Sequence, residues 1–106
     1  MPKHLIRGSY TVEGVKGLLK EGGSKRVEAV KQLAEAVGGK VEGFYFGYGE
    51  DDFFIITDGA DDVGVLAANL IAEATGTLKV RSAVLLTPEE VDEVAKISAP
   101  YRPPGQ

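Results

Sequence analysis

Three cations lie in strand-like segments of this 106-residue chain, and they are the first candidates for binding an anion. Arg7 lies in a short segment near the start, and Lys79 and Arg81 lie two residues apart in a later one. If these segments are neighbouring strands whose small and apolar residues face helices, the three cations share the opposite face. Two guanidinium groups there can hold a carboxylate or enolate oxygen. The alternative is structural pairing with Glu42 and Asp58, because unpaired buried cations are costly.

A glycine turn provides a second candidate anion site at Ser24, Lys25 and Arg26, which follow Gly22 and Gly23. Free backbone N–H groups at the start of a helix, with two cations beside them, suit an anion. The glycine pattern of a P-loop is absent. The alternative is that the glycines only interrupt the chain and that Ser24 caps the next helix without a ligand.

One histidine and three tyrosines complete the candidates for ligand binding. His4 is the only imidazole, the side chain best suited to proton transfer near neutral pH, so it is a candidate general base or axial haem ligand. Tyr10, Tyr45 and Tyr48 can orient a phenolic or quinone-like substrate through their hydroxyl groups. The alternatives are a surface histidine at the end of a strand, and aromatic residues that belong to the core or to a dimer interface.

The chain offers little metal-binding or nucleophilic chemistry. It has no Cys, which excludes disulfides, thiolate metal sites and a cysteine nucleophile, and one His cannot form a multi-histidine site within one subunit. Glu50, Asp51 and Asp52 are three consecutive carboxylates that could hold Mg²⁺ or Ca²⁺ weakly, but the loop pattern of an EF-hand is missing. We interpret them as the solvated tip of a hairpin and expect neither a metal site nor a cofactor.

Charge and hydropathy argue against two classes of partner. The net charge is -4, whereas general nucleic-acid binding favours a basic surface. Residues 1–48 hold eight Lys or Arg and five Asp or Glu, and residues 49–106 hold four and eleven, which permits a basic pocket on an acidic protein. No apolar run approaches the roughly 18 residues of a membrane helix, and no signal peptide precedes the first strand-like segment. We expect a cytoplasmic protein of bacterial type that binds neither nucleic acid nor membrane.

The elements that must position these residues are four strands and four helical stretches. We predict strands at residues 4–10, 40–48, 52–58 and 78–86, and helices at residues 11–19, 24–37, 61–74 and 87–97. The expected N-caps are Thr11, Ser24, Asp61 or Asp62, and Thr87, the last with the capping-box spacing to Glu90. The residues expected to face inward from the third helix are Val63, Leu66, Leu70 and Ile71.

This order of elements predicts an α+β, ferredoxin-like βαββαβ fold with an extra C-terminal helix. The predicted helices cover one face of the antiparallel sheet. In the third strand, Phe53, Ile55 and Thr57 point to one face and Phe54, Ile56 and Asp58 to the other, so both faces are largely apolar. A second copy of the sheet is the most economical cover for the other face, which predicts a homodimer with two sheets packed face to face.

The domain is expected to span residues 1–97, and residues 98–106 to form an extended Pro-rich tail. Pro103 and Pro104 lack backbone N–H groups and cannot continue a helix. A stiff segment that carries Tyr101 and Arg102 has the reach to lie over a neighbouring subunit, so we expect the ring of Tyr101 to pack against protein.

Four groups of residues resemble the GYD domain family. They are Glu21–Arg26, Phe44–Gly47 with Gly49–Asp52, Leu85–Asp92, and the tail segment Tyr101–Gly105. The resemblance covers nearly the whole chain and implies a ferredoxin-like fold of the dimeric α/β-barrel type. It implies little about activity, because the family is largely of unknown function and the wider barrel class includes monooxygenases, isomerases, haem-handling proteins and plain binding modules.

Three functions remain open at this point. The first is a homodimeric module that binds a small anionic or aromatic molecule between its two sheets, at the candidate residues named above. The second is a cofactor-independent monooxygenase or isomerase, which also needs a base and an oxyanion stabiliser at one pocket, with His4 and Arg7 or Arg81 in those roles. The third is a structural or protein-interaction module with a filled interior. An open pocket on which these side chains converge would favour the first two.

Overall fold

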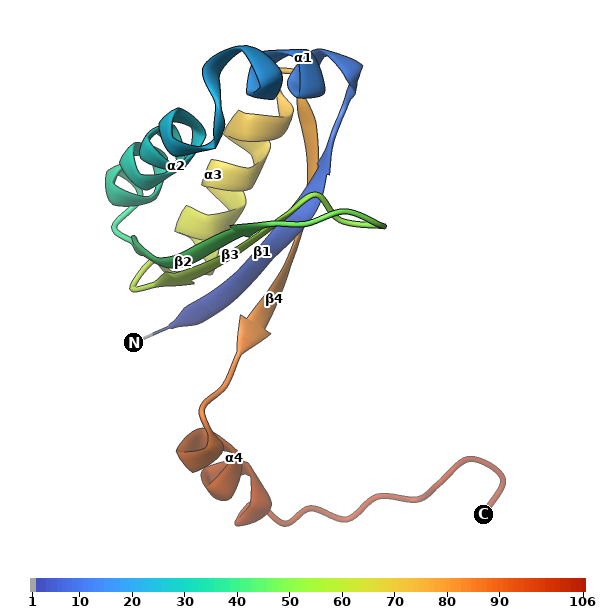
Figure 1. Ribbon diagram of the computed structural model, residues 1–106. Helices are drawn as coiled ribbons and strands as arrows, with labels where there is room; N and C mark the ends of the chain where they lie inside the picture. The colour runs from blue at the N-terminus through green and yellow to red at the C-terminus, as the bar shows by residue number, and fades with distance from the viewer. Residues whose placement is uncertain (1) are drawn as a thin grey trace.

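The computed structural model, which describes residues 2–106, consists of a four-stranded antiparallel sheet with helices on one face and a C-terminal arm (Figure 1). The strands are β1 (Lys3–Tyr10), β2 (Lys40–Phe46), β3 (Phe53–Asp58) and β4 (Leu78–Leu85), in the spatial order β2-β3-β1-β4. The helices are α1 (Val12–Glu21), α2 (Gly23–Ala36), α3 (Asp62–Glu73) and α4 (Pro88–Ala95). The predicted ferredoxin-like α+β fold is therefore confirmed, with the first helical region divided into α1 and α2.

Alternation along β3 separates the two faces of the sheet as predicted. Phe53, Ile55 and Thr57 are buried beneath the helices, whereas Phe54 and Ile56 lie on the face that no helix covers. Cross-strand partners share a face, so the register of β1 with β3 and β4, and of β2 with β3, defines this second surface, which we call the open face. Its residues are Lys3, Leu5, Arg7, Ser9, Lys40, Gly43, Tyr45, Phe54, Ile56, Asp58, Lys79, Arg81, Ala83 and Leu85.

Three of the four predicted N-caps are confirmed, and the cap of α2 is not. The side chains of Thr11, Asp61 and Thr87 accept hydrogen bonds from the first turns of α1, α3 and α4. Ser24 lies inside α2, which begins at Gly23 with Gly22 as its N-cap. Gly22 has φ of 84°, and its N–H donates to Leu18 O at 2.8 Å, so this residue ends α1 and starts α2.

The inward face of α3 differs from the prediction. Val63, Leu66 and Leu70 are 77%, 57% and 54% exposed. Ile71 is also 56% exposed, but it shares the side of α3 toward the sheet with Val65, Ala68, Asn69 and Ala72. The helix is apolar on most of its circumference, so periodicity alone does not select a face. The selection comes from small residues, since a Cβ at Gly64 would lie only 2.9 Å from Val37 O.

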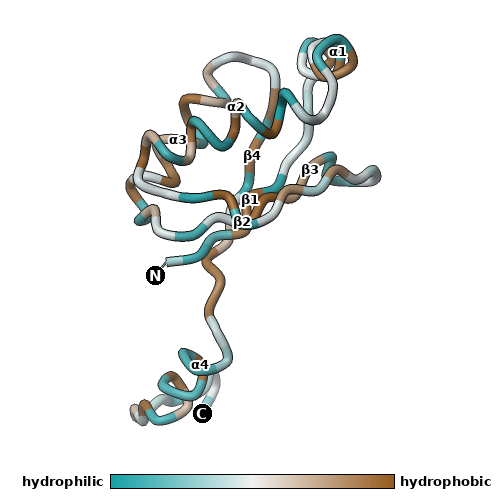
Figure 2. Tube along the Cα trace, turned by 60° about the vertical axis from the view of Figure 1, so that its left-hand side comes forward, coloured by the Kyte–Doolittle hydropathy of each residue, from teal (hydrophilic) through white to brown (hydrophobic). Residues whose placement is uncertain are grey.

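Helix α4 and the tail form an arm that stands apart from the rest of the domain. Figures 1 and 2 place this arm beyond the end of β4, on the opposite side of the sheet from α2 and α3. Every residue of α4 is exposed. The ring of Tyr101 is also exposed, so within one chain the expected packing of Tyr101 against protein does not occur. None of the helices in residues 2–106 has the length and hydropathy to cross a bilayer.

Gly14 should tolerate no side chain, although it lies in a helix. A Cβ at Gly14 would lie 1.9 Å from Thr77 O, where the start of α1 meets the turn before β4. We expect Gly14→Ala to lower the free energy of unfolding by about 1–3 kcal/mol, as overpacking does. Gly17 is the matched control, because a Cβ there meets nothing within 4 Å, and Gly17→Ala should raise stability by up to about 1 kcal/mol. Equal urea-unfolding curves for the two variants would contradict this account of α1.

Candidate functional site

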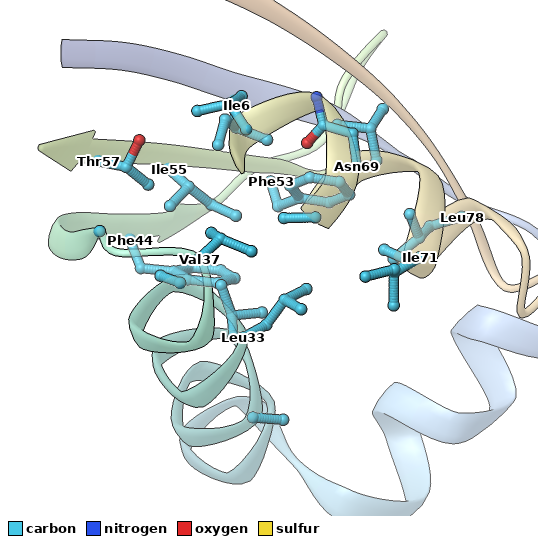
Figure 3. Close-up of a pocket in the computed structure, with 18 of the residues that line it drawn as sticks. Ile6, Leu33, Val37, Phe44, Phe53, Ile55, Thr57, Asn69, Ile71 and Leu78 are labelled. Atoms are coloured by element: carbon cyan, nitrogen blue, oxygen red, sulfur yellow. The ribbon is translucent and has the colours of Figure 1, made fainter. Parts of the chain in front are cut away.

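A cavity of about 390 Å³ lies between α2, α3 and the helix-covered face of the sheet (Figure 3). Its volume falls within the range of small-molecule sites in proteins. The labelled side chains that line it are Ile6, Leu33, Val37, Phe44, Phe53, Ile55, Thr57, Asn69, Ile71 and Leu78. Most of this lining is aliphatic or aromatic, so the cavity suits an apolar molecule.

The cavity exists because small side chains face the sheet from the helix layer. Ala29 and Ala34 contribute from α2, Ala60 lies just before α3, and Ala68 and Ala72 contribute from α3 itself. No side chain in the described part of the chain is less than 2% exposed, which is unusual for a core. The unfilled space leaves its apolar walls without close neighbours, and a ligand of matching shape would supply those contacts.

Polar groups mark the two ends of the cavity. Thr57 is buried, and its hydroxyl has no hydrogen-bond partner among residues 2–106. Tyr10 and Arg26 line the other end of the cavity. On β1, Tyr10 lies six residues from His4, the partner of Thr57, which is about 20 Å at 3.3 Å per residue. The Nη1 atom of Arg26 lies 3.4 Å from Glu21 Oε1, and its Nε atom is buried without a partner among the same residues.

The environment of Tyr10 keeps its phenol protonated. Its ring centroid lies 5.2 Å from that of Phe53, and burial raises the pKa of the phenol. The charge of Arg26 lowers this pKa and the carboxylates of Asp52 and Glu21 raise it, with burial the largest influence. Tyr10 can therefore donate a hydrogen bond at neutral pH, but it is a poor base there.

The open face carries a second cluster, formed by Arg7, Arg81 and Asp51. The two arginines are direct cross-strand partners. Asp51 Oδ1 and Oδ2 accept hydrogen bonds from Arg81 Nη2 at 2.9 and 3.0 Å, and Arg7 Nε lies 3.9 Å from Asp51 Oδ2. One carboxylate therefore partly neutralises two adjacent guanidinium groups. The Asp51 side chain is only 9% exposed.

Glu42 and Asp58, the carboxylates expected to pair with the arginines, form ion pairs with a different cation. Glu42 and Asp58 both form ion pairs with Lys3, with Asp58 Oδ2 at 3.8 Å from Lys3 Nζ. The register of β2 shifts between Val41 and Gly43, so Glu42 occupies a β-bulge beside the end of β1.

The prediction that Asp51 and Asp52 lie at a solvated tip is wrong. The Asp52 N–H donates to Gly8 O at 2.7 Å, and Asp52 Oδ2 accepts from the Tyr10 N–H at 2.9 Å. These bonds hold the β2–β3 hairpin against β1, which places Asp51 beside Arg7 and Arg81. The spacing of acidic residues does not reveal this contact, because it depends on the order of strands in the sheet.

The remaining candidates do not converge on one pocket. His4 is buried, not at the surface, and its Nε2 lies 2.9 Å from Asp62 Oδ1, outside the lining of the cavity. Tyr45 and Lys79 are exposed on the open face, and Tyr48 is fully exposed in the hairpin. Tyr10 and Arg26 therefore belong to the cavity, whereas Arg7, Tyr45, Lys79 and Arg81 lie on the open face across the sheet. His4 and Tyr48 belong to neither group.

The predicted anion site in the first turn of α2 has cations but no side-chain cap. Lys25 is exposed, Arg26 contacts Glu21, and the first turn of α2 holds no acidic residue. The side chain of Ser24 makes no capping hydrogen bond. In the part of the chain that the structure describes, no three His, Asp or Glu side chains group as metal ligands would.

Comparison with known protein families gives a match to the GYD domain over residues 4–95. No curated protein matches the chain.

The raised pKa of Tyr10 predicts how stability changes in alkaline solution. Because the folded pKa lies above the ordinary 10.0, the unfolded chain loses this proton first, and the free energy of unfolding falls as pH rises through that range. Tyr10→Phe should remove this pH-dependent fall in the free energy of unfolding. It should also remove the tyrosine ionisation that occurs at the highest pH in an ultraviolet titration. Tyr48→Phe, which removes an exposed phenol, is the control. Identical changes in both variants would contradict the assignment.

The contact of Asp51 with the arginine pair predicts a salt-dependent contribution to stability. Asp51→Asn should lower the free energy of unfolding by about 1 kcal/mol, and less at high ionic strength, because the arginines are partly exposed and screened. Glu50→Gln removes a neighbouring exposed charge and should change little. If the two variants unfold alike at low salt, Asp51 does not stabilise the arginine pair.

Proposed function

Because the chain belongs to the GYD domain family, whose function is unknown, we propose a function from its geometry: the protein is a module that binds a small, largely apolar molecule. The single observation that supports this proposal is the cavity between α2, α3 and the sheet. Apolar walls supply most of the binding free energy of such ligands, and a few polar groups orient them.

The polar groups of the cavity narrow the ligand class. Tyr10 is a neutral hydrogen-bond donor, and Arg26 adds a cation at the same end. Toward the other end, Thr57 offers a hydroxyl that has no hydrogen-bond partner in the described part of the chain. The proposed ligand has an aromatic or aliphatic body and an acceptor group, such as a carboxylate or a phenolate, that lies near Tyr10 and Arg26. It occupies the helix side of the sheet, whereas the sequence favoured the space between two sheets.

Binding is favoured over catalysis by the position of the imidazole. A cofactor-independent oxygenase or isomerase needs a base and an oxyanion stabiliser around one substrate. His4 lies outside the cavity lining and contacts Asp62, and Tyr10 keeps its proton at neutral pH. Arg7 and Arg81 lie on the other face and contact Asp51.

Two copies of the chain are proposed to pair through their open faces. Leu5, Phe54 and Ile56 form an apolar strip across β1 and β3 on this face, and no helix covers them. Packing of two such sheets would bury these strips against each other at the usual distance of about 10 Å. The ligand cavity lies on the outer side of each sheet in this arrangement, so binding does not depend on the pairing.

Titration with a neutral naphthylamine dye tests whether the cavity binds a small apolar molecule, since the fluorescence of the dye rises in apolar surroundings. We expect saturable binding that Ala29→Leu weakens by about tenfold, because added methyl groups in a binding pocket have effects of this order. Ala36→Leu is the matched control, as Ala36 lies on the same helix outside the cavity lining.

Amide chemical shifts identify where the dye binds. Shifts at Leu33 and Ile55 would support the proposal, since both residues line the cavity. Absence of saturable binding, or shifts confined to Phe54 and Ile56 on the open face, would overturn it.

A further inference from the structure

We propose that α4 of one copy docks on α1 of a second copy, so that the C-terminal arm acts as a clasp between the subunits. This inference rests on the homodimer proposed above. It assigns a partner to two exposed apolar stripes that have none among residues 2–106 of their own chain.

The first stripe lies on the arm. Val91, Val94 and Ile97 recur every three residues and are all at least half exposed. A helix of eight residues is marginal in water, even with the capping box that Thr87 and Glu90 form. Helix α4 therefore requires a packing surface to bury this stripe, and in this structure it stands apart from its own domain with all its residues exposed (Figure 1).

The second stripe lies on α1. Val12, Val15 and Leu19 follow the helical spacing and are exposed, with Leu19 at 81%. The opposite side of α1 is fixed to the domain, because Gly14 is buried against Thr77 O and the Thr11 N–H donates to the same oxygen at 2.9 Å. This stripe therefore points outward from a rigid support.

The topology places the two stripes so that two-fold symmetry brings them together. Helix α1 follows the end of β1 at Tyr10, which pairs with Leu78, whereas α4 follows the other end of β4 at Leu85, which pairs with Lys3. The arm also projects to the side of the open face. Consider a two-fold axis that lies between the two paired sheets and runs perpendicular to their strands. Rotation about this axis places the α4 end of one sheet opposite the α1 end of the other, so each arm reaches the α1 of its partner.

The charges beside the two stripes are complementary. Helix α4 holds four carboxylates and no cation, namely Glu89, Glu90, Asp92 and Glu93. Residues 12–31, which include α1 and the first turns of α2, hold five Lys or Arg against three Glu. Lys20 and Lys25 are exposed where α1 ends and α2 begins. The acidic residues of the partner's α4 would then lie at the turn with Ser24, Lys25 and Arg26, which the sequence analysis predicted as an anion site.

Disulfide cross-linking tests the clasp cleanly, because the chain contains no Cys. Full-length Leu19→Cys and Val94→Cys chains are mixed, oxidised and separated without reductant. We expect a covalent dimer that forms on the order of tenfold faster than in the control mixture, because docking raises the local thiol concentration. The control pairs Val94→Cys with Ala36→Cys, since Ala36 is exposed and is the last residue of α2, at the end of that helix away from α1.

Charged substitutions, followed by sedimentation, distinguish the clasp from the sheet-to-sheet dimer on which it rests. Leu19→Asp and Val94→Asp should each raise the dimer dissociation constant, and neither residue is buried within the chain. Phe54→Asp tests the sheet contact independently. A wild-type chain that sediments as a monomer at micromolar concentration would overturn both the homodimer and the clasp. A dimer in which the mixed chains cross-link no faster than the control would overturn the clasp alone.

The double variant, Leu19→Cys with Val94→Cys, tests the symmetry. A closed two-fold arrangement gives covalent dimers only. An intramolecular cross-link would show that α4 folds back on its own domain, and a ladder of larger species would show an open chain of copies; either result would overturn the proposal.

Discussion

The register of β1 between β3 and β4 is the constraint on which the other features depend. It sets Arg7 beside Arg81, and it brings the β2–β3 hairpin close enough for Asp52 to bond the backbone at Gly8 and Tyr10. The pairing leaves no room for a side chain at Gly8, where a Cβ would lie 1.9 Å from Lys79 O. Because side chains alternate along a strand, a shift of β1 by one residue would move Arg7 to the helix side and Tyr10 to the open face.

The helix layer follows a different rule, because its small residues set the distance to the sheet without filling the space. Gly64 and Gly14 bring α3 and α1 close to backbone oxygens, while alanines face the sheet at the centre. Large apolar side chains such as Leu66 and Leu70 point outward. The domain thus keeps its helices in place through a few close contacts and retains an unfilled interior, the feature on which the proposed binding function rests.

The sequence predicts the elements better than it predicts the contacts between them. The alternation in β3 and the caps at Thr11 and Thr87 are local signals, and the structure confirms them. The position of Asp51 depends on the order of the strands, and the inward face of α3 depends on which residues allow close approach, so neither could be read from spacing. The cavity cannot be read from spacing either, because alanines at helical spacing suggest a tightly packed core and give no measure of how far the helices stand from the sheet.

The order of the strands also determines how the sheet ends on each side. β2 and β4 are the edge strands, and an unprotected edge offers its free N–H and C=O groups to any other extended chain. On one edge the bulge between Val41 and Gly43 breaks the regular ladder and carries Glu42, and on the other edge Lys79 and Arg81 place charges along β4. Both edges therefore resist the edge-to-edge strand addition from which fibres grow, which leaves the faces of the molecule for the pairing proposed above.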